Sequence, residues 1–512
     1  GMSVWRINGT RVPFPQYWMS WAKKLVWLSL GLSMAGCTLG PIFSRPGSPN
    51  HADYSSAENP LATSTEAVAG RDGQSQRFVK GLDLPAQWWQ LFRSPSLNEL
   101  IEQALKNNND LKAAQAALRL ANENVKAQQG FFFPTVQAGV SPSRQRNAIG
   151  TLSPTLASGN AIYNLYTSQV AISYAPDVFG LNRRLVESLK AQAEFQSHLL
   201  QATYVTLTAN VAQAAVQEAS LRSQIQANES LIKIQKEQLS IFNQQLNLGA
   251  VSMNDIAAQE AQLAQTQALL PPLKQQLSIQ RNLLTALSGQ LPQDSIKQSF
   301  ELNSLHLPDT LPVSLPSSLV DQRPDVRAAE ATLHSATAQI GVAMANRLPQ
   351  FSITAAAGGA STVFSQMFRA DNVFWGIASS ATQTLFDGRT LLHRKLAAEA
   401  AFEQAAAQYR STVVGAFQNV ADALRALEYD AQALKAQSEA EQATAKSLSF
   451  AQKGFELGSL SYLAVLNAQQ AYQQSLIGVA QARASRYADS IALFQALGGG
   501  WWNNPELNRL EK

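Results

Sequence analysis

The 512-residue chain has few of the residues that build catalytic and metal centres. Its one cysteine, Cys37, excludes a disulfide framework and any cluster of cysteine ligands. The five histidines lie apart without ligand spacing, and neither an H-E-x-x-H nor a G-x-x-x-x-G-K-[ST] motif occurs. We therefore expect no enzymatic activity, no metal site and no bound cofactor.

Charged residues are also scarce, at 15% of the chain, against about 25% in typical soluble domains. The formal net charge is +4, and the first 36 residues hold four bases and no acid. The remainder has 36 bases and 36 acids and is neutral. A general nucleic-acid surface is therefore not expected.

No apolar run reaches the roughly 20 residues that a membrane-spanning helix needs. The run from Leu25 to Ala35 follows two lysines, and this pattern predicts a secretory signal over residues 1–36, with Met19 as the true start. Residues 33–37 (SMAGC) resemble a bacterial lipobox, which implies a diacylglycerol on Cys37. The alternative is a buried free cysteine. Thr38 follows where an Asp would signal inner-membrane retention, so the resemblance implies outer-membrane sorting.

After Cys37 we expect a lipidated N-terminal segment and linker over residues 37–95, of which 47–80 is polar and predicted to be poorly structured. Ser96 is the predicted N-cap of the first helix. Residues 181–248 contain neither Pro nor Gly, and a continuous helix there would be about 100 Å long. Gly249 ends it, and a second helix over 254–287 is expected to be disturbed at its two prolines.

The same order of elements occurs twice. Short alternating segments near residues 136–140, 170–174, 351–355 and 375–379 predict two strands in each half. DLKAAQAAL at residue 110 matches DVRAAEATL at residue 325, and LGAVS at residue 248 matches LGSLS at residue 457. We therefore predict a first repeat over 96–300, a second over 301–500 and a C-terminal tail over 501–512.

The four predicted strands would have unpaired edges, and these edges need hydrogen-bonding partners. A barrel closed across several chains removes every edge, and apolar residues that alternate with small or polar ones suit an outer-membrane barrel. A water-soluble β-sandwich is the alternative for the strands alone. The long helices allow either a tunnel wall with water on both sides or a solid coiled-coil rod.

Several segments, in this order and spacing, resemble the lipoprotein branch of the TolC-like outer-membrane efflux protein family. The resemblance runs from Cys37 to about Gly500 and rests on residues 37–46 (CTLGPIFSRP), the paired Phe133-Pro134 and Leu348-Pro349, the paired turns 177–180 (DVFG) and 385–389 (LFDGR), and 323–330 (RPDVRAAE).

The resemblance implies a mainly α protein that forms a homotrimer in the bacterial outer membrane. Each chain would give four strands to a twelve-stranded transmembrane β-barrel, and long helical hairpins would form an α-barrel tunnel in the periplasm. The trimer would be a passive exit duct for small molecules and drugs. Its partners would be a periplasmic adaptor (membrane fusion protein), an RND or ABC pump in the inner membrane, and outer-membrane lipid.

The family's hairpin tips are the predicted functional site. Gly249, Ser252, Gly458 and Ser461 are the predicted adaptor-contact residues at the two tips. The acidic ring that the family has beyond the second tip is missing, because Ala464 and Asn467 stand there. We predict Leu463 as an apolar pore constriction, with Asn467 and Asp255 as a polar ring. The alternative is that Leu463 packs between helices.

Two other functions share parts of this pattern. A periplasmic coiled-coil adaptor or structural lipoprotein would have the export signal, the lipid and the helices, but no membrane barrel. The same type of channel could also serve type I protein secretion. The substrate is not readable from the sequence.

Overall fold

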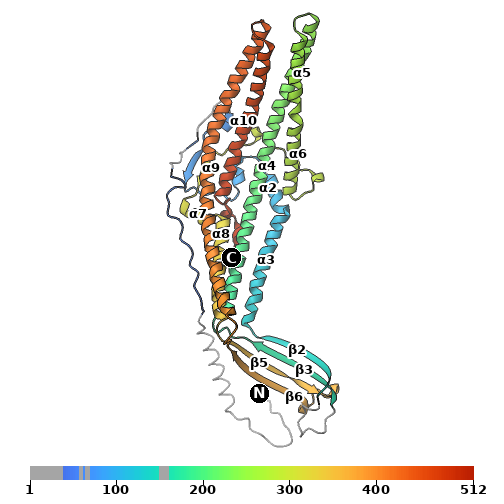
Figure 1. The fold of residues 1–512 in the computed structure, drawn as a ribbon, viewed down its shortest axis with the longest axis vertical. Coiled ribbons are helices and arrows are strands. Elements are labelled where there is room, and N and C mark those ends of the chain that lie inside the picture. The colour runs from blue at the N-terminus through green and yellow to red at the C-terminus, as the bar shows by residue number, and fades with distance from the viewer. Residues whose placement is uncertain (1–37, 57–61, 64–69, 149–160, 512) are drawn as a thin grey trace, which may run out of the picture. The chain divides into compact units, whose positions relative to one another are not determined.

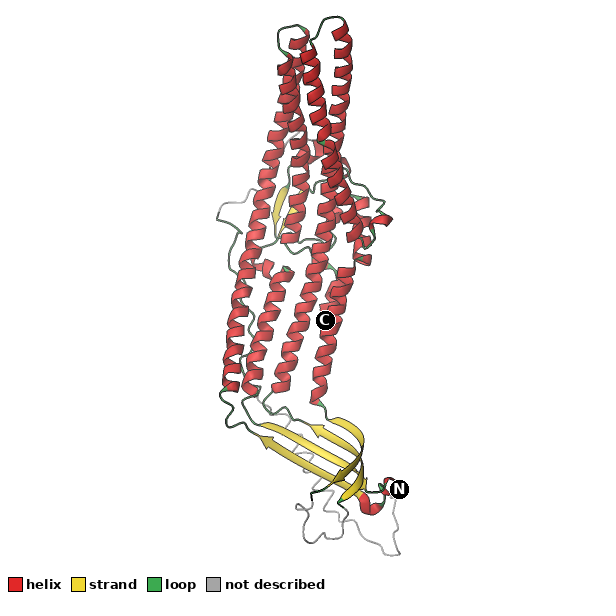
Figure 2. Ribbon diagram, turned by 45° about the vertical axis from the view of Figure 1, so that its right-hand side comes forward, coloured by secondary structure: helices red, strands yellow, loops and turns green. Residues whose placement is uncertain are grey.

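The computed structural model of the chain describes residues 38–56, 62–63, 70–148 and 161–511. This part is mainly helical with a small β component (Figures 1 and 2). The chain forms two compact units, each built from both predicted repeats. The first comprises Gly1–Ser44, Ala121–Gln192 and Leu333–Ala405; the second comprises Arg45–Leu120, Ala193–Thr332 and Ala406–Lys512.

Two very long helices, α4 and α9, dominate the helical part. They are Leu181–Asn247 and Thr390–Glu456, each 67 residues long and offset by 209 positions. The predicted long helices are therefore confirmed, and α9 runs without a break through Gly415 and Gly454. The other helices are α2 (Pro95–Asn107), α3 (Asn109–Gln129), α5 (Met253–Ala268), α6 (Leu270–Leu287), α7 (Pro316–Gln322), α8 (Pro324–Ala345), α10 (Tyr462–Ala496) and α11 (Pro505–Glu511).

Prolines set several helix boundaries. The break between α5 and α6 falls at Leu269, with prolines in the first turn of α6, where the missing N–H costs nothing. The prediction of Ser96 as the first N-cap is wrong, because a proline also sets this helix boundary. Pro95 takes the first helical position of α2, and the Ser94 hydroxyl accepts the hydrogen bond from the Leu97 N–H at 3.2 Å.

The first unit contains one antiparallel sheet in the order β2-β3-β5-β6. The strands are β2 (Thr135–Arg146), β3 (Ile162–Tyr174), β5 (Gln350–Ser361) and β6 (Val373–Thr382). Both strand pairs were predicted, but β2 and β3 extend beyond the predicted segments, because Ser143, Arg144 and Gln145 continue the pairing with β3. The edge strands of this sheet are β2 and β6.

The two faces of the sheet differ in chemistry. One row of register partners across the four strands is Val136, Ile172, Ala355 and Ile377, and the next row is Gln137, Ala171, Ala356 and Gly376. Successive residues point to opposite faces, so one face is apolar and the other polar or small. Within the chain Val136 and Ile377 are 64% and 72% exposed. The described part of the chain therefore leaves these apolar side chains uncovered.

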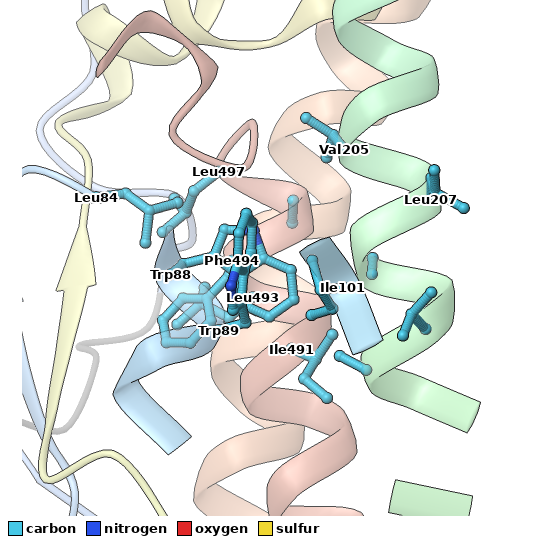
Figure 3. Close-up of a cluster of buried hydrophobic side chains, with 14 of the residues drawn as sticks. Leu84, Trp88, Trp89, Ile101, Val205, Leu207, Ile491, Leu493, Phe494 and Leu497 are labelled. Carbon is cyan, nitrogen blue, oxygen red and sulfur yellow. The ribbon is translucent and has the colours of Figure 1, made fainter. Parts of the chain in front are cut away.

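The largest core lies in the second unit, around two adjacent tryptophans (Figure 3). Trp88 and Trp89 are essentially buried, and the ring of Trp88 lies 5.7 Å from that of Phe494 on α10. Ile101 from α2 and Leu207 from α4 belong to the same cluster. Burial of large aromatic rings makes this cluster a major source of stability.

The prediction that residues 47–80 are poorly structured is partly wrong. Its residues 77–80 form β1 (Arg77–Lys80), which pairs in parallel with β4 (Thr310–Val313). The residues before β1 are bound by the buried Arg486 on α10. Its guanidinium donates to the backbone oxygen of Gln74 at 2.9 Å and to the Thr63 hydroxyl at 3.0 Å. Long-range polar contacts therefore order a sequence that has little hydrophobic content of its own.

The C-terminal segment 501–512 is also folded over its described residues. Trp501 is buried, and its indole N–H donates to the carbonyl oxygen of Gln322 at 2.6 Å. The short helix α11 follows.

Hydropathy identifies no helix in the described part of the chain with both the length and the apolar character needed to cross a membrane.

Candidate functional site

Each long helix ends in a tight turn that begins a hairpin. Gly249 follows α4 and Gly458 follows α9, with φ of +73° and +71°. Only glycine adopts this left-handed backbone at little cost, so the predicted glycine turns are confirmed. The neighbouring Leu248 and Leu457 are 83% and 84% exposed. Each tip therefore presents an apolar side chain to its surroundings.

The helix that leaves the first tip has a capping box. The Ser252 hydroxyl accepts from the Asp255 N–H at 3.1 Å, and the Asp255 carboxylate accepts from the Ser252 N–H at 3.1 Å. The carboxylate thereby satisfies backbone donors at the start of α5 and sits favourably at a helix N-terminus. Asp255 thus has a structural role at the tip, and its place in a polar ring stays a prediction. At the second tip Ser461 is the N-cap without a side-chain hydrogen bond.

A buried aromatic cluster joins the two hairpins just behind their tips. Phe242 of α4 lies 4.8 Å from Tyr462 of α10 and 5.8 Å from Phe455 of α9, measured between ring centroids. The Tyr462 hydroxyl donates to the side-chain oxygen of Gln259 on α5. Ile256 completes the contact from α5. All four helices therefore meet in one small core.

Burial explains the chemistry of this core. Phe242 and Tyr462 are 1% and 4% exposed. Burial raises the pKa of the Tyr462 phenol, and the charge of Asp255 raises it further. The phenol is therefore a neutral hydrogen-bond donor at physiological pH, and it holds α10 to α5 directly.

The predicted constriction residues lie on the outer side of this core. Leu463 is 64% exposed and follows the buried Tyr462, and Asn467 lies one helical turn further along α10 and is also exposed. Leu463 is therefore not buried between helices of its own chain. Its role as a constriction, and that of Asn467 in a polar ring, stay predictions.

All four predicted adaptor-contact residues are exposed at the tips: Gly249, Ser252, Gly458 and Ser461. Their role in binding an adaptor stays a prediction. The predicted lipidation site, Cys37, lies outside the described residues. Within the described ranges, no group of three or more His, Cys, Asp or Glu side chains is placed to hold a metal ion.

Sequence reasoning missed the aromatic cluster. A signal was present, because an aromatic residue precedes each glycine turn, Phe242 before Gly249 and Phe455 before Gly458, and Tyr462 follows the second turn. Phe242 lies more than 200 residues from Phe455 and Tyr462 in the sequence, and this distance hid their common position.

The model of the family described as "Outer membrane efflux protein" matches residues 100–290 and 315–499. The chain is 30% identical over 432 residues to the pyoverdine export outer membrane protein OpmQ of Pseudomonas putida, covering 84% of this chain and 91% of that protein. It is 28% identical over 491 residues to the cation efflux system protein CusC of Escherichia coli O6:H1, covering 93% and 99%. Among solved structures, the outer-membrane channel OprN superposes with a TM-score of 0.79 at 26% identity, over 91% of this chain and 100% of that one.

These matches extend over both repeats and both hairpins. A mainly helical chain with two long hairpins and a small sheet is the fold of TolC-like outer-membrane channels. The chain belongs to the outer membrane efflux protein family. It is an exit duct for efflux at the outer membrane, and this role replaces the alternative of a periplasmic coiled-coil adaptor or structural lipoprotein.

Proposed function

We propose that three copies of the chain assemble into a passive duct that carries small solutes across the outer membrane. The observation that carries this proposal is the four-stranded sheet, which has one apolar face and two edge strands that no other described strand pairs on the outer side. An edge strand with unpaired N–H and C=O groups requires a partner, above all in a bilayer. Pairing β2 of one copy with β6 of the next closes a twelve-stranded barrel with the apolar face toward lipid.

The helical tunnel and its partners belong to the same proposal. The long helices of three copies would line a periplasmic tunnel, and the exposed tips around Leu248 and Leu457 would dock a periplasmic adaptor. Exposed leucines beside glycine turns offer apolar contact area at little entropic cost. An inner-membrane RND or ABC pump would supply the energy, so the chain itself would carry out no catalysis and would need no cofactor.

We further propose that Cys37 carries a diacylglycerol after removal of the signal. One lipid anchor adds to the membrane attachment that a barrel provides, but does not replace it. For the cargo, the names of two relatives specify small solutes, pyoverdine and a cation. This supports solute efflux over protein secretion for the present chain.

A disulfide scan across the proposed seam tests the assembly. Within one sheet β2 and β6 are separated by two strands, roughly 14 Å at about 4.8 Å per strand spacing, which is beyond the roughly 7 Å limit for a disulfide. Pairs that join Val136→Cys or Val140→Cys with Trp375→Cys or Ile377→Cys should therefore cross-link only between copies. The expected result is dimers and trimers on non-reducing gels.

The matched control is Val136→Cys with Ile353→Cys, because β5 is an interior strand and should not reach β2 of any copy. Planar-bilayer conductance and the mass in detergent complete the test. Trimers with discrete conductance steps and heat-modifiable gel migration are expected. A monomer without conductance and without intermolecular cross-links in any pair would overturn the proposal.

A further inference from the structure

The first unit contains an apolar pocket at the junction of helices and sheet. It has a volume of about 530 Å³ and is lined by the segments that end α3, begin α4 and precede β5, within the roughly 300–1,000 Å³ range of ligand sites. Five of its lining residues are aromatic: Phe131, Phe133, Tyr174, Phe179 and Phe351. Aromatic and aliphatic walls of this kind suit a hydrocarbon chain.

Polar side chains also line the pocket, and most of their groups are hydrogen-bonded within the protein. The Asp177 carboxylate accepts the backbone N–H groups of Asn182 and Arg183, both at 2.9 Å, and so caps α4. The side-chain oxygen of Asn182 accepts from Gln128 at 2.7 Å. Its amide nitrogen is buried and has no hydrogen-bond partner among the described residues. Because this nitrogen has almost no accessible surface, it adds no polar group to the wall that an occupant would meet.

The start of the described chain is fixed next to this pocket. A Cβ added at Gly180 would lie 3.0 Å from the Cα of Thr38, so the two backbones are in close contact. Gly180 stands between Phe179 and Leu181, both of which line the pocket. The Arg184 guanidinium then donates to the backbone oxygens of Leu39 at 2.8 Å and Gly40 at 3.1 Å.

We propose that this pocket seats an acyl chain of the lipid carried by Cys37. The inference rests on the proposed lipidation and extends it to a binding site. Consecutive Cα atoms are about 3.8 Å apart, so the lipidated residue is bonded to a residue already held against the pocket's rim.

Two features favour this occupant over a free bilayer lipid. The hydrogen bonds from Arg184 fix the chain at Leu39, two residues from Cys37, which gives the attached acyl chain a high effective concentration at the pocket. The close contact between Thr38 and Gly180 holds the residue bonded to Cys37 beside Phe179 and Leu181, which line the pocket. A free lipid has neither advantage.

Photo-cross-linking in intact cells tests the proposal on the full-length protein. Cells are fed a diazirine-bearing palmitic acid, irradiated, and the purified protein is digested and analysed by mass spectrometry. We expect cross-links from pocket peptides around Phe131 and 178–185 to the peptide that contains Cys37. Cross-links from these peptides to phospholipid would instead assign the pocket to the bilayer and overturn the proposal. Acylated Cys37 without any pocket cross-link would overturn it as well.

Unacylated Cys37 would be a separate outcome, visible in the mass of the N-terminal peptide, and would refute the proposed lipidation itself. A variant pair adds a check on the pocket. Leu185→Trp fills the lined space and should abolish the pocket cross-link while Cys37 stays acylated. The control, Leu199→Trp, lies on the same helix outside the pocket and should leave the cross-link unchanged. Equal yields in both variants would contradict the assignment.

Discussion

Truncation of Phe242 to alanine should loosen both hairpin tips at once. The ring is 1% exposed and contacts Phe455 and Tyr462 at centroid distances of 5.8 and 4.8 Å. A buried Phe→Ala change costs about 3–5 kcal/mol, of which each ring pair contributes roughly 0.5–1.5 kcal/mol beyond burial. Because the small core at the tips is separate from the large core around Trp88, the loss should appear as local opening.

The expected size follows from this cost. A loss of about 3 kcal/mol raises the opening equilibrium by roughly 100-fold, since every 1.4 kcal/mol is about tenfold. Hydrogen exchange followed by mass spectrometry should therefore show much faster exchange in the peptides 239–247 and 462–468. Peptides of α2 around Ile101 should exchange as in the parent protein.

The control for this experiment is Phe450→Ala on α9. Phe450 is 62% exposed and lies outside the buried cluster, so its truncation should leave the exchange of both tips unchanged. Equal acceleration in the two variants, or none in Phe242→Ala, would refute the idea that the aromatic cluster couples the hairpins.

Three further predictions concern the tips and a buried carboxyl pair. Leu463→Ala combined with Asn467→Ala should raise single-channel conductance by widening the opening, and unchanged conductance would count against the constriction. Ser252→Ala should destabilise the start of α5 by about 1 kcal/mol, seen as faster exchange in its first turn; the control Ser461→Ala should have little effect, since that cap makes no side-chain hydrogen bond. Burial raises the pKa of Asp430 to about 8, helped by the neighbouring Asp489 carboxylate, which accepts a hydrogen bond from the protonated Asp430 and repels its charged form. The folded protein then binds more protons than the unfolded chain, so this group's contribution to stability is full below about pH 4 and is lost as pH rises through about 8. Asp430→Asn should flatten this decline in thermal unfolding scans, and an unchanged pH dependence would contradict it.

The sequence predicted those features that depend on local chemistry. The absence of Pro and Gly over 181–248 predicted α4. The turns at Gly249 and Gly458 have a left-handed backbone, which favours glycine. The prolines between α5 and α6 mark a break because proline lacks a backbone donor. Alternation of apolar with small residues predicted both strand pairs.

The features that the sequence did not reveal depend on contacts between distant segments. Arg486 binds backbone and hydroxyl oxygens more than 400 residues upstream, and no local pattern announces these acceptors. The pairing of β1 with β4 joins four-residue strands about 230 residues apart. At the candidate site the glycines and Ser252 were identified, whereas the ring cluster of Phe242, Phe455 and Tyr462 was not.

The equal length of α4 and α9 has a consequence for how such a protein can change. If one helix lost a heptad, its tip would withdraw by about 10 Å from that of its counterpart, since each residue contributes about 1.5 Å. Phe242 would then miss Tyr462, and the core that joins the hairpins would not form. A viable deletion or insertion must therefore be mirrored in the other half of the gene at the corresponding position. The two halves of the sequence therefore each specify the same hairpin length, and the two lengths must change together.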